Sequence, residues 1–164
     1  MAQARIRNCL WFDSQAEEAA KHYTSIFRNS RIVSVTRYPP VGQEIHGRPA
    51  GSVMTVIFEL DGVSIMALNG GPLFKFNEAI SLEVRCKDQA EVDYFWEKLG
   101  AGGDPKAQAC GWLKDKYGLS WQVVPDGFEE MMEDTSSPGA RRAFGAMMEM
   151  KKLDLAALKK AYKG

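Results

Sequence analysis

Hydrophobic residues recur at two different spacings along the chain, and the two spacings predict alternating strands and helices. Alternation of apolar and polar residues from 6 to 12 predicts a strand, and the apolar residues from Ala16 to Phe27 recur at helical spacing. Three β-prone runs follow at 31–38, 51–60 and 63–68, with the hairpin signal Asp61-Gly62 between the last two. Residues 4–69 therefore form a predicted β-α-β-β-β module.

The second half repeats this order in shortened form over residues 78–125. Gln15-Ala-Glu17 recurs as Gln89-Ala-Glu91, and the same offset of 74 residues carries Leu10 onto Val84. The later hairpin repeats at a shorter offset of 56 residues, which carries Met66 onto Gln122. A strand at 79–86, a helix after Asp88, and strands at 109–114 and 119–124 make up this second module.

Local signals place the helix starts and the core. Ser14-Gln-Ala-Glu17 has the S-x-x-E form of a capping box, and Asp88 begins an equivalent segment. Within 31–38 we expect Ile32, Val33 and Val35 to face the core.

Residues 126–164 are predicted to form a helical tail. Ser137 followed by Pro138 is typical of a helix start, and Asp154 is placed to cap a last helix. The tail is rich in methionine, which favours ordinary packing over a binding surface. We expect it to pack on the outside of the β core or against a partner subunit.

Composition excludes several classes of function. Lys plus Arg equals Asp plus Glu at 21 each, so nothing marks a nucleic-acid-binding or anionic-membrane surface, and no apolar run is long enough to span a bilayer. The three cysteines are scattered, and no signal peptide is recognisable. These features predict a cytoplasmic protein of one domain, residues 1–164, whose cysteines are buried packing residues.

Several motifs accompany the doubled module. They are Cys9-Leu-Trp-Phe-Asp13, Ala16-Glu-Glu-Ala19 with Tyr23, Gly51-Ser-Val-Met-Thr55, Asn69-Gly-Gly-Pro72, Phe74-Lys-Phe-Asn-Glu-Ala-Ile-Ser81, Cys110-Gly-Trp-Leu-Lys-Asp115, Gly118-Leu-Ser-Trp-Gln-Val-Val-Pro125 and Met150-Lys-Lys-Leu-Asp-Leu-Ala-Ala-Leu158. With these motifs the chain resembles the vicinal oxygen chelate superfamily of glyoxalase I, bleomycin-resistance proteins and extradiol dioxygenases. It is most similar to the PhnB-like branch, often labelled 3-demethylubiquinone-9 3-methyltransferase. The resemblance implies an α+β fold, two βαβββ modules around a small-molecule cavity, and a homodimer.

Metal-using members of that superfamily bind a divalent ion through residues on the first and last strands of a module. The superfamily pattern places those positions near Arg7 and Met66 in the first module, and near Ala79 and Gln122 in the second. The cationic side chain of Arg7, the thioether of Met66 and the methyl group of Ala79 are unsuitable ligands for a hard ion. Gln122 alone does not make a site. We therefore expect no metal and no other cofactor. Methyl transfer is also not expected, because neither Gly-Gly pair has the strand-turn-helix context of a Rossmann-type nucleotide site.

The stretch 69–81 links the modules and also carries candidate site residues. We expect a small-molecule ligand to contact six residues: Trp11, Asn69, Phe74, Phe76, Trp112 and Gln122. The candidate catalytic residues are Glu78, Asn77 and Arg7, with Glu78 acting as a base if an apolar setting raises its pKa. The alternative is that Glu78 is exposed or paired with Lys75. Three functions stay open: metal-free ligand binding, an enzyme acting on a small oxygenated or aromatic metabolite, and a regulatory module that uses the tail.

Overall fold

A computed structural model describes residues 5–164, and the chain divides into two compact units, Met1–Lys75 and Phe76–Gly164. Each unit holds one small sheet with helices, so the fold is α+β as the sequence predicts. The boundary between the units falls inside the predicted linker, 69–81. The single domain over 1–164 stays a prediction, and its first four residues lie outside the described part.

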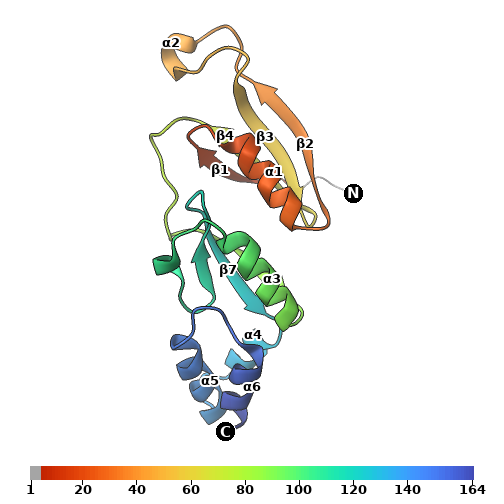
Figure 1. Ribbon diagram of the computed structural model, residues 1–164, viewed down its shortest axis with the longest axis vertical. Coiled ribbons are helices and arrows are strands. Elements are labelled where there is room, and N and C mark those ends of the chain that lie inside the picture. Colours follow the sequence, from red (N-terminus) through yellow and green to blue (C-terminus); the bar gives the residue numbers. More distant parts are fainter. Residues whose placement is uncertain (1–4) are drawn as a thin grey trace. The chain divides into compact units, whose positions relative to one another are not determined.

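The first unit has the predicted βαβββ order with one additional helical turn. Its elements are β1 (Asn8–Phe12), α1 (Ala16–Ile26), β2 (Ser30–Arg37), α2 (Gln43–His46), β3 (Val53–Leu60) and β4 (Val63–Asn69). The strands lie in the order β1-β4-β3-β2, with β1 parallel to β4 and the other pairs antiparallel. Helix α1 covers one face of this sheet (Figure 1).

The core of the first unit lies between α1 and that face. Buried residues alternate along β3 and β4, where Val56, Phe58 and Ala67 are fully buried. Helix α1 contributes Ala16, Ala19, Ala20, Tyr23 and Ile26. Because alanine side chains are short, the helix can lie close to the sheet. The intervening residues of the strands point to the opposite side, which we call the helix-free face.

The prediction that Val33 and Val35 are core residues is wrong. Val33 is 49% and Val35 is 38% exposed, and Ile32 is half-buried. The strand β2 lies at one edge of the sheet, and Val33 falls at a register shift between Ile32 and Ser34. Val35 pairs with the buried Val56, but at the edge of the sheet its side chain stays partly uncovered. An apolar alternation alone does not reveal either feature.

The predicted capping box at the start of α1 is also wrong. Gln15 is the N-cap residue, and no side chain in the cap itself accepts a hydrogen bond from the helix. Instead the amide of Ala16 donates to Oδ1 of Asn69, at 2.8 Å, from the end of β4. Nδ2 of Asn69 donates to the carbonyl of Val53 at 3.0 Å, and the Tyr38 hydroxyl donates to the Asn69 carbonyl at 2.7 Å. One buried residue therefore joins α1, the start of β3 and the end of β2.

This arrangement predicts opposite results for two substitutions near α1. Asn69→Ala leaves a buried amide and a partly buried carbonyl without the partner that Asn69 provides, so it should lower the free energy of unfolding by about 2–3 kcal/mol. Ser14→Ala should lie within about 0.5 kcal/mol of wild type, because Ser14 is exposed and does not cap the helix. Urea unfolding followed by circular dichroism measures both. Equal losses for the two variants would contradict this account of the cap.

The second unit begins with the shortened module. Its elements are β5 (Ser81–Cys86), α3 (Gln89–Gly100), a 3-10 turn (Pro105–Ala107), β6 (Trp112–Lys114) and β7 (Ser120–Pro125). The sheet order is β5-β7-β6, with β5 parallel to β7 and β6 antiparallel to it. Asp88 caps α3 as predicted, since its side chain accepts a hydrogen bond from the amide of Glu91.

The strand pairing reproduces the internal repeat of the sequence. Leu10 pairs with Ala67 in the first sheet, and Val84 pairs with Val123 in the second. These pairs are related by the offsets of 74 and 56 residues found in the sequence. Both modules therefore share the parallel pair of strands, and the sheet of the second module has one strand fewer than that of the first.

The tail forms three helices, α4 (Phe128–Met132), α5 (Pro138–Met148) and α6 (Leu155–Lys163). Ser137 and Asp154 cap α5 and α6 as predicted. A core of its own joins the helices, made by Met131, Ala143, Leu153 and Leu158. The backbone amides of Cys110 and Gly111 donate to the carbonyls of Met150 and Lys151, at 2.7 and 2.8 Å. The tail is therefore fixed to the β6 end of the second module.

Candidate functional site

The predicted site residues divide between the two units. Arg7, Trp11, Asn69 and Phe74 belong to the first unit, whereas Phe76, Asn77, Glu78, Trp112 and Gln122 belong to the second. Each group is described within its own unit.

In the first unit, Trp11 and Phe74 form a fixed aromatic pair. Their ring centroids lie 4.9 Å apart in an edge-to-face arrangement. The indole Nε1 donates to the carbonyl of Gly71 at 2.8 Å. A Cβ atom at Gly70 would overlap the indole ring, so glycine is required there. Trp11 is nevertheless only half-buried and Phe74 is 58% exposed, which leaves aromatic surface accessible.

Trp11 lies in a row of side chains across the helix-free face. The pairing aligns Trp11 with Leu68, Leu68 with Thr55, and Thr55 with Thr36. Because opposed residues in a sheet point to the same side, the row has an aromatic end, an aliphatic middle and a hydroxyl end. The hydroxyls of Thr36 and Thr55 lie 2.6 Å apart. This face combines apolar area with polar groups, as small-molecule sites do.

Asn69 and Arg7 occupy different settings beside that row. Asn69 is 6% exposed, and its Oδ1, Nδ2 and backbone carbonyl are all hydrogen-bonded inside the unit. It therefore positions Gly70 and the aromatic pair rather than presenting a polar group to a ligand. Arg7 is half-buried and lies directly before β1.

A cluster around Arg48 was not predicted from the sequence. Nη2 of Arg48 donates to the backbone carbonyl of Asp13 at 2.6 Å and to its carboxylate at 2.9 Å. The amide of Arg48 donates to Nδ1 of His46, whose ring stacks on Tyr38 with centroids 4.5 Å apart. The cluster fixes the loop 38–52 against the end of β1. The sequence indicates only that Pro39-Pro40 ends the strand before a polar loop, and it does not show which loop residues bind one another.

In the second unit, Glu78 forms an ion pair with Lys114. The hydrogen bond from Lys114 is the largest cause that holds the pKa of Glu78 below its ordinary value, and the side chain is exposed. The apolar setting that would raise the pKa of Glu78 is therefore absent, and the nearby cation favours the carboxylate. Glu78 is exposed, as expected, but its ion-pair partner is Lys114 rather than Lys75. Asn77 is exposed and its Oδ1 accepts a hydrogen bond from the Ala79 amide, whereas Phe76 is half-buried.

Trp112 and Gln122 lie opposite each other on the helix-free face of the second sheet. Gln122 Nε2 donates to Ser81 Oγ at 2.9 Å. In the next row, Ser120 pairs with both Lys114 and Ser81. Ser120 is 1% exposed, and within the described residues its hydroxyl has no hydrogen-bond partner. An unsatisfied buried hydroxyl is unfavourable, so this row has an unused hydrogen-bonding group.

The residues at the metal-ligand positions of the fold do not fit a divalent ion. Arg7 is a cation, Met66 offers only a soft sulfur opposite Cys9, and Ala79 has no donor atom. Gln122 offers a single amide oxygen, which alone does not make a site, and its Nε2 donates to Ser81 Oγ. Among residues 5–164 there is no group of three or more His, Cys, Asp or Glu side chains arranged to hold a metal. That the protein works without metal stays a prediction.

The three cysteines have different settings. Burial raises the pKa of Cys86 to about 12 and also raises that of Cys9. Cys9 is exposed on the helix-free face of the first sheet, so the expectation that all cysteines are buried is wrong. A thiol with a raised pKa holds little thiolate at neutral pH, which makes it a weak nucleophile.

The chain is similar to several solved bacterial proteins. A PhnB protein from Bacillus cereus is 35% identical, with 74% of this chain and 99% of that chain covered at a TM-score of 0.64. Protein PA1353 from Pseudomonas aeruginosa is 18% identical over 75% of this chain and 98% of its own, at 0.57. The fosfomycin resistance protein FosX from Listeria monocytogenes is 14% identical over 82% of this chain and 100% of its own, at 0.54. Among functionally curated proteins none matches.

Each of the two sheets has an outer strand parallel to an inner one and a helix on one face, as in the vicinal oxygen chelate superfamily, to which PhnB and FosX belong. Residues 4–124 match the model of one family within it. The chain belongs to the 3-demethylubiquinone-9 3-methyltransferase family, the PhnB-like branch. The matched range ends before α4, so the helical tail lies outside it. None of the helices described in residues 5–164 is long and apolar enough to cross a membrane.

The contact between Gly70 and the indole predicts a local effect of a small substitution. In Gly70→Ala the new methyl group should displace Trp11, break its hydrogen bond to Gly71, and destabilise the first unit by about 1–3 kcal/mol. Near-ultraviolet circular dichroism and tryptophan fluorescence report the displacement. Gly145→Ala is the control, since the added methyl has open space in α5 and should stabilise the protein by up to about 1 kcal/mol. An unchanged tryptophan environment in Gly70→Ala would show that the contact is not tight.

The ion pair between Glu78 and Lys114 predicts a measurable change in titration. In Lys114→Met the pKa of Glu78 should rise toward its ordinary value, because the largest cause of its lowering is removed. A carboxylate with a lowered pKa stabilises the fold above its unfolded pKa and loses that contribution as pH falls through the folded pKa. The variant should therefore lose part of this acid dependence. Carboxylate chemical shifts followed by NMR from pH 2 to 7 measure both proteins, with Lys98→Met as control. Identical titration of Glu78 in the two proteins would disprove the pairing in solution.

Proposed function

We propose that this PhnB-like protein binds a small molecule on the helix-free faces of its sheets, without a resident metal ion. The observation that carries the proposal is the aromatic pair of Trp11 and Phe74. A hydrogen bond, a close glycine contact and a buried asparagine hold Trp11 in place, yet the pair keeps accessible aromatic surface. Fixed aromatic groups lose little conformational entropy when a ligand binds.

The neighbouring side chains favour an oxygenated or aromatic ligand. In the first unit the Trp11 row ends in the hydroxyls of Thr55 and Thr36. In the second unit the helix-free face carries Trp112 and Gln122. A ligand with an apolar ring and hydrogen-bonding oxygens suits either face. Phe76 stays a candidate contact of the second unit.

Binding without metal is supported by the ligand positions themselves. Arg7, Met66 and Ala79 replace the oxygen and nitrogen donors that a divalent ion needs. We therefore infer that hydrogen bonds and ring contacts, rather than coordination, orient the ligand.

The alternative function is an enzyme acting on a small oxygenated or aromatic metabolite. The candidate catalytic residues Glu78, Asn77 and Arg7 belong to this alternative. The lowered pKa makes Glu78 a weak base but leaves it fully charged at neutral pH, where it could stabilise a cation. Methyl transfer is less well supported, because Gly70-Gly71 follows a strand without opening a helix, and Gly102-Gly103 follows α3. The homodimer and the cytoplasmic location stay predictions.

A ligand screen followed by matched variants tests the binding proposal. Thermal-shift measurements with small aromatic and oxygenated compounds should yield a ligand that raises Tm, and its Kd should not change after EDTA treatment. Phe74→Ala should weaken that ligand by about tenfold, because it loses ring contact without loss of a buried core residue. Tyr94→Ala is the control, since Tyr94 is an exposed aromatic residue on α3.

Three outcomes would contradict the proposal. They are a ligand whose binding is lost with EDTA, equal effects of Phe74→Ala and Tyr94→Ala, and the absence of any ligand from a screen of several hundred metabolites. Turnover of the ligand that is lost in Glu78→Gln would instead favour the enzyme.

A further inference from the structure

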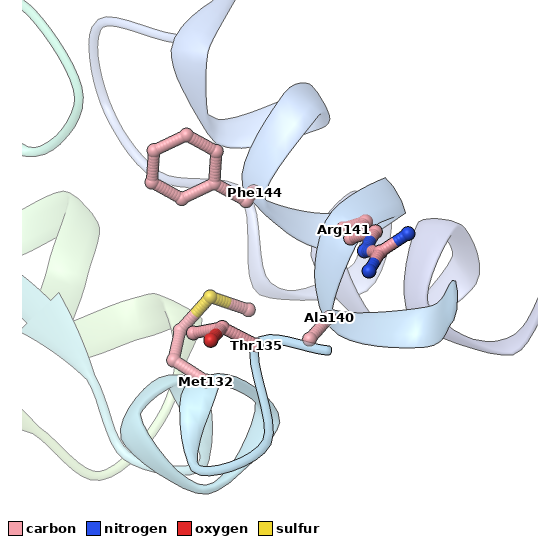
Figure 2. A pocket seen from close by; sticks show the side chains of 5 residues that line it. All are labelled: Met132, Thr135, Ala140, Arg141 and Phe144. Carbon is pink, nitrogen blue, oxygen red and sulfur yellow. The ribbon is translucent and has the colours of Figure 1, made fainter. Parts of the chain in front are cut away.

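The helical tail contains a pocket that is separate from the helix-free faces. It lies between α4 and α5, has a volume of about 290 Å³, and is lined by Met132, Thr135, Ala140, Arg141 and Phe144 (Figure 2). Ligand sites in proteins are commonly about 300–1,000 Å³, so this pocket lies just below that range and suits only a small ligand. It lies outside the residues that match the family.

The lining has a polarity that points to one class of ligand. Met132 and Phe144 lie on one side in Figure 2, and the guanidinium of Arg141 lies on the other, with Ala140 between them. The pocket is therefore apolar at one end and positively charged at the rim. The Thr135 hydroxyl adds a hydrogen-bond donor.

Two neighbouring arginines on α5 differ in what they bind. Arg142 donates to the carbonyls of Ala161 and Tyr162, at 2.8 and 2.7 Å, and so holds the end of α6. Across the described part of the chain, no ion pair or side-chain hydrogen bond joins the Arg141 guanidinium to another residue. Arg142 therefore links α5 to the end of α6, whereas Arg141 lines the pocket.

Phe144 is likewise not used by the core of the tail. The preceding residue, Ala143, is fully buried against Met131, Leu153 and Leu158, whereas Phe144 is 52% exposed beside the pocket. Covering an exposed phenyl ring is favourable, and the pocket offers space for a ligand to do so.

We propose that this tail pocket binds a small carboxylate with an apolar body. The carboxylate pairs with the guanidinium of Arg141, and the apolar body covers Phe144 and Met132. Guanidinium groups bind carboxylates through paired hydrogen bonds, which gives preference over neutral analogues. The proposal is independent of the function proposed above, since no residue is shared.

Titration of the full chain with two matched probes tests the proposal. 4-Phenylbutyrate carries the charge, and 4-phenylbutanol has the same apolar body without it. In ¹⁵N-labelled protein the acid should shift amide signals of residues 132–144 and bind at least about fivefold more tightly than the alcohol. Arg141→Gln should remove this preference while the alcohol binds as before. Phe144→Ala should weaken both probes by about tenfold.

Matched controls distinguish recognition from general charge or unfolding. Lys159→Gln removes one positive charge from the neighbouring helix α6 and should leave the affinity for the acid unchanged. Circular dichroism verifies that each variant keeps its helices. Equal binding of acid and alcohol, an unchanged preference in Arg141→Gln, or shifts confined to other residues would overturn the proposal. A second copy of the chain that covers the pocket would also overturn the proposal. It would shift the same amide signals as the protein concentration rises, without any probe.

Discussion

The buried carboxamide of Asn69 is the interaction on which the first unit depends. Its oxygen accepts the amide of Ala16 at the start of α1, its nitrogen donates to Val53, and its backbone carbonyl accepts the Tyr38 hydroxyl. Side chains of hydrophobic residues can shift by fractions of an ångström, but these hydrogen bonds fix directions as well as distances. The following residue, Gly70, is thereby positioned under the indole of Trp11. The exposed aromatic pair is thus a consequence of a polar contact in the core.

Much of the fold could be predicted because its causes are local. The alternation of apolar residues, the caps at Asp88, Ser137 and Asp154, and the repeated offsets all depend on residues close together in the sequence. The same was not true of the start of α1. Ser14 and Glu17 have the spacing of a capping box, but Asn69 supplies the cap from 53 positions away. A competing partner distant in sequence cannot be seen in the motif itself.

The candidate site was harder to predict for a related reason. The sequence identifies Trp11, Phe74, Trp112 and Gln122 as residues of a suitable type, and the strand registers place each tryptophan on a helix-free face. The lowered pKa of Glu78 depends on Lys114, which lies 36 positions away in the sequence. The local sequence does not reveal this partner, because Lys75 is the nearer cation along the chain. The Arg48 cluster similarly depends on how a loop folds back on Asp13. The sequence shows the type of each residue directly, but the pKa of Glu78 and the contacts of Arg48 depend on residues distant in the sequence.

The attachment of the tail has a consequence for how the chain can evolve. The amides of Cys110 and Gly111 bind the carbonyls of Met150 and Lys151, so the side chains at 150 and 151 are not part of the attachment. The steric demand falls on Gly111, where a Cβ would lie 3.1 Å from Leu153 and 3.2 Å from the Val123 carbonyl. Substitutions should therefore accumulate at the exposed Lys151 without moving the tail, whereas Met150 also packs against the tail core and position 111 tolerates almost none. A lineage can vary the tail surface and keep its attachment.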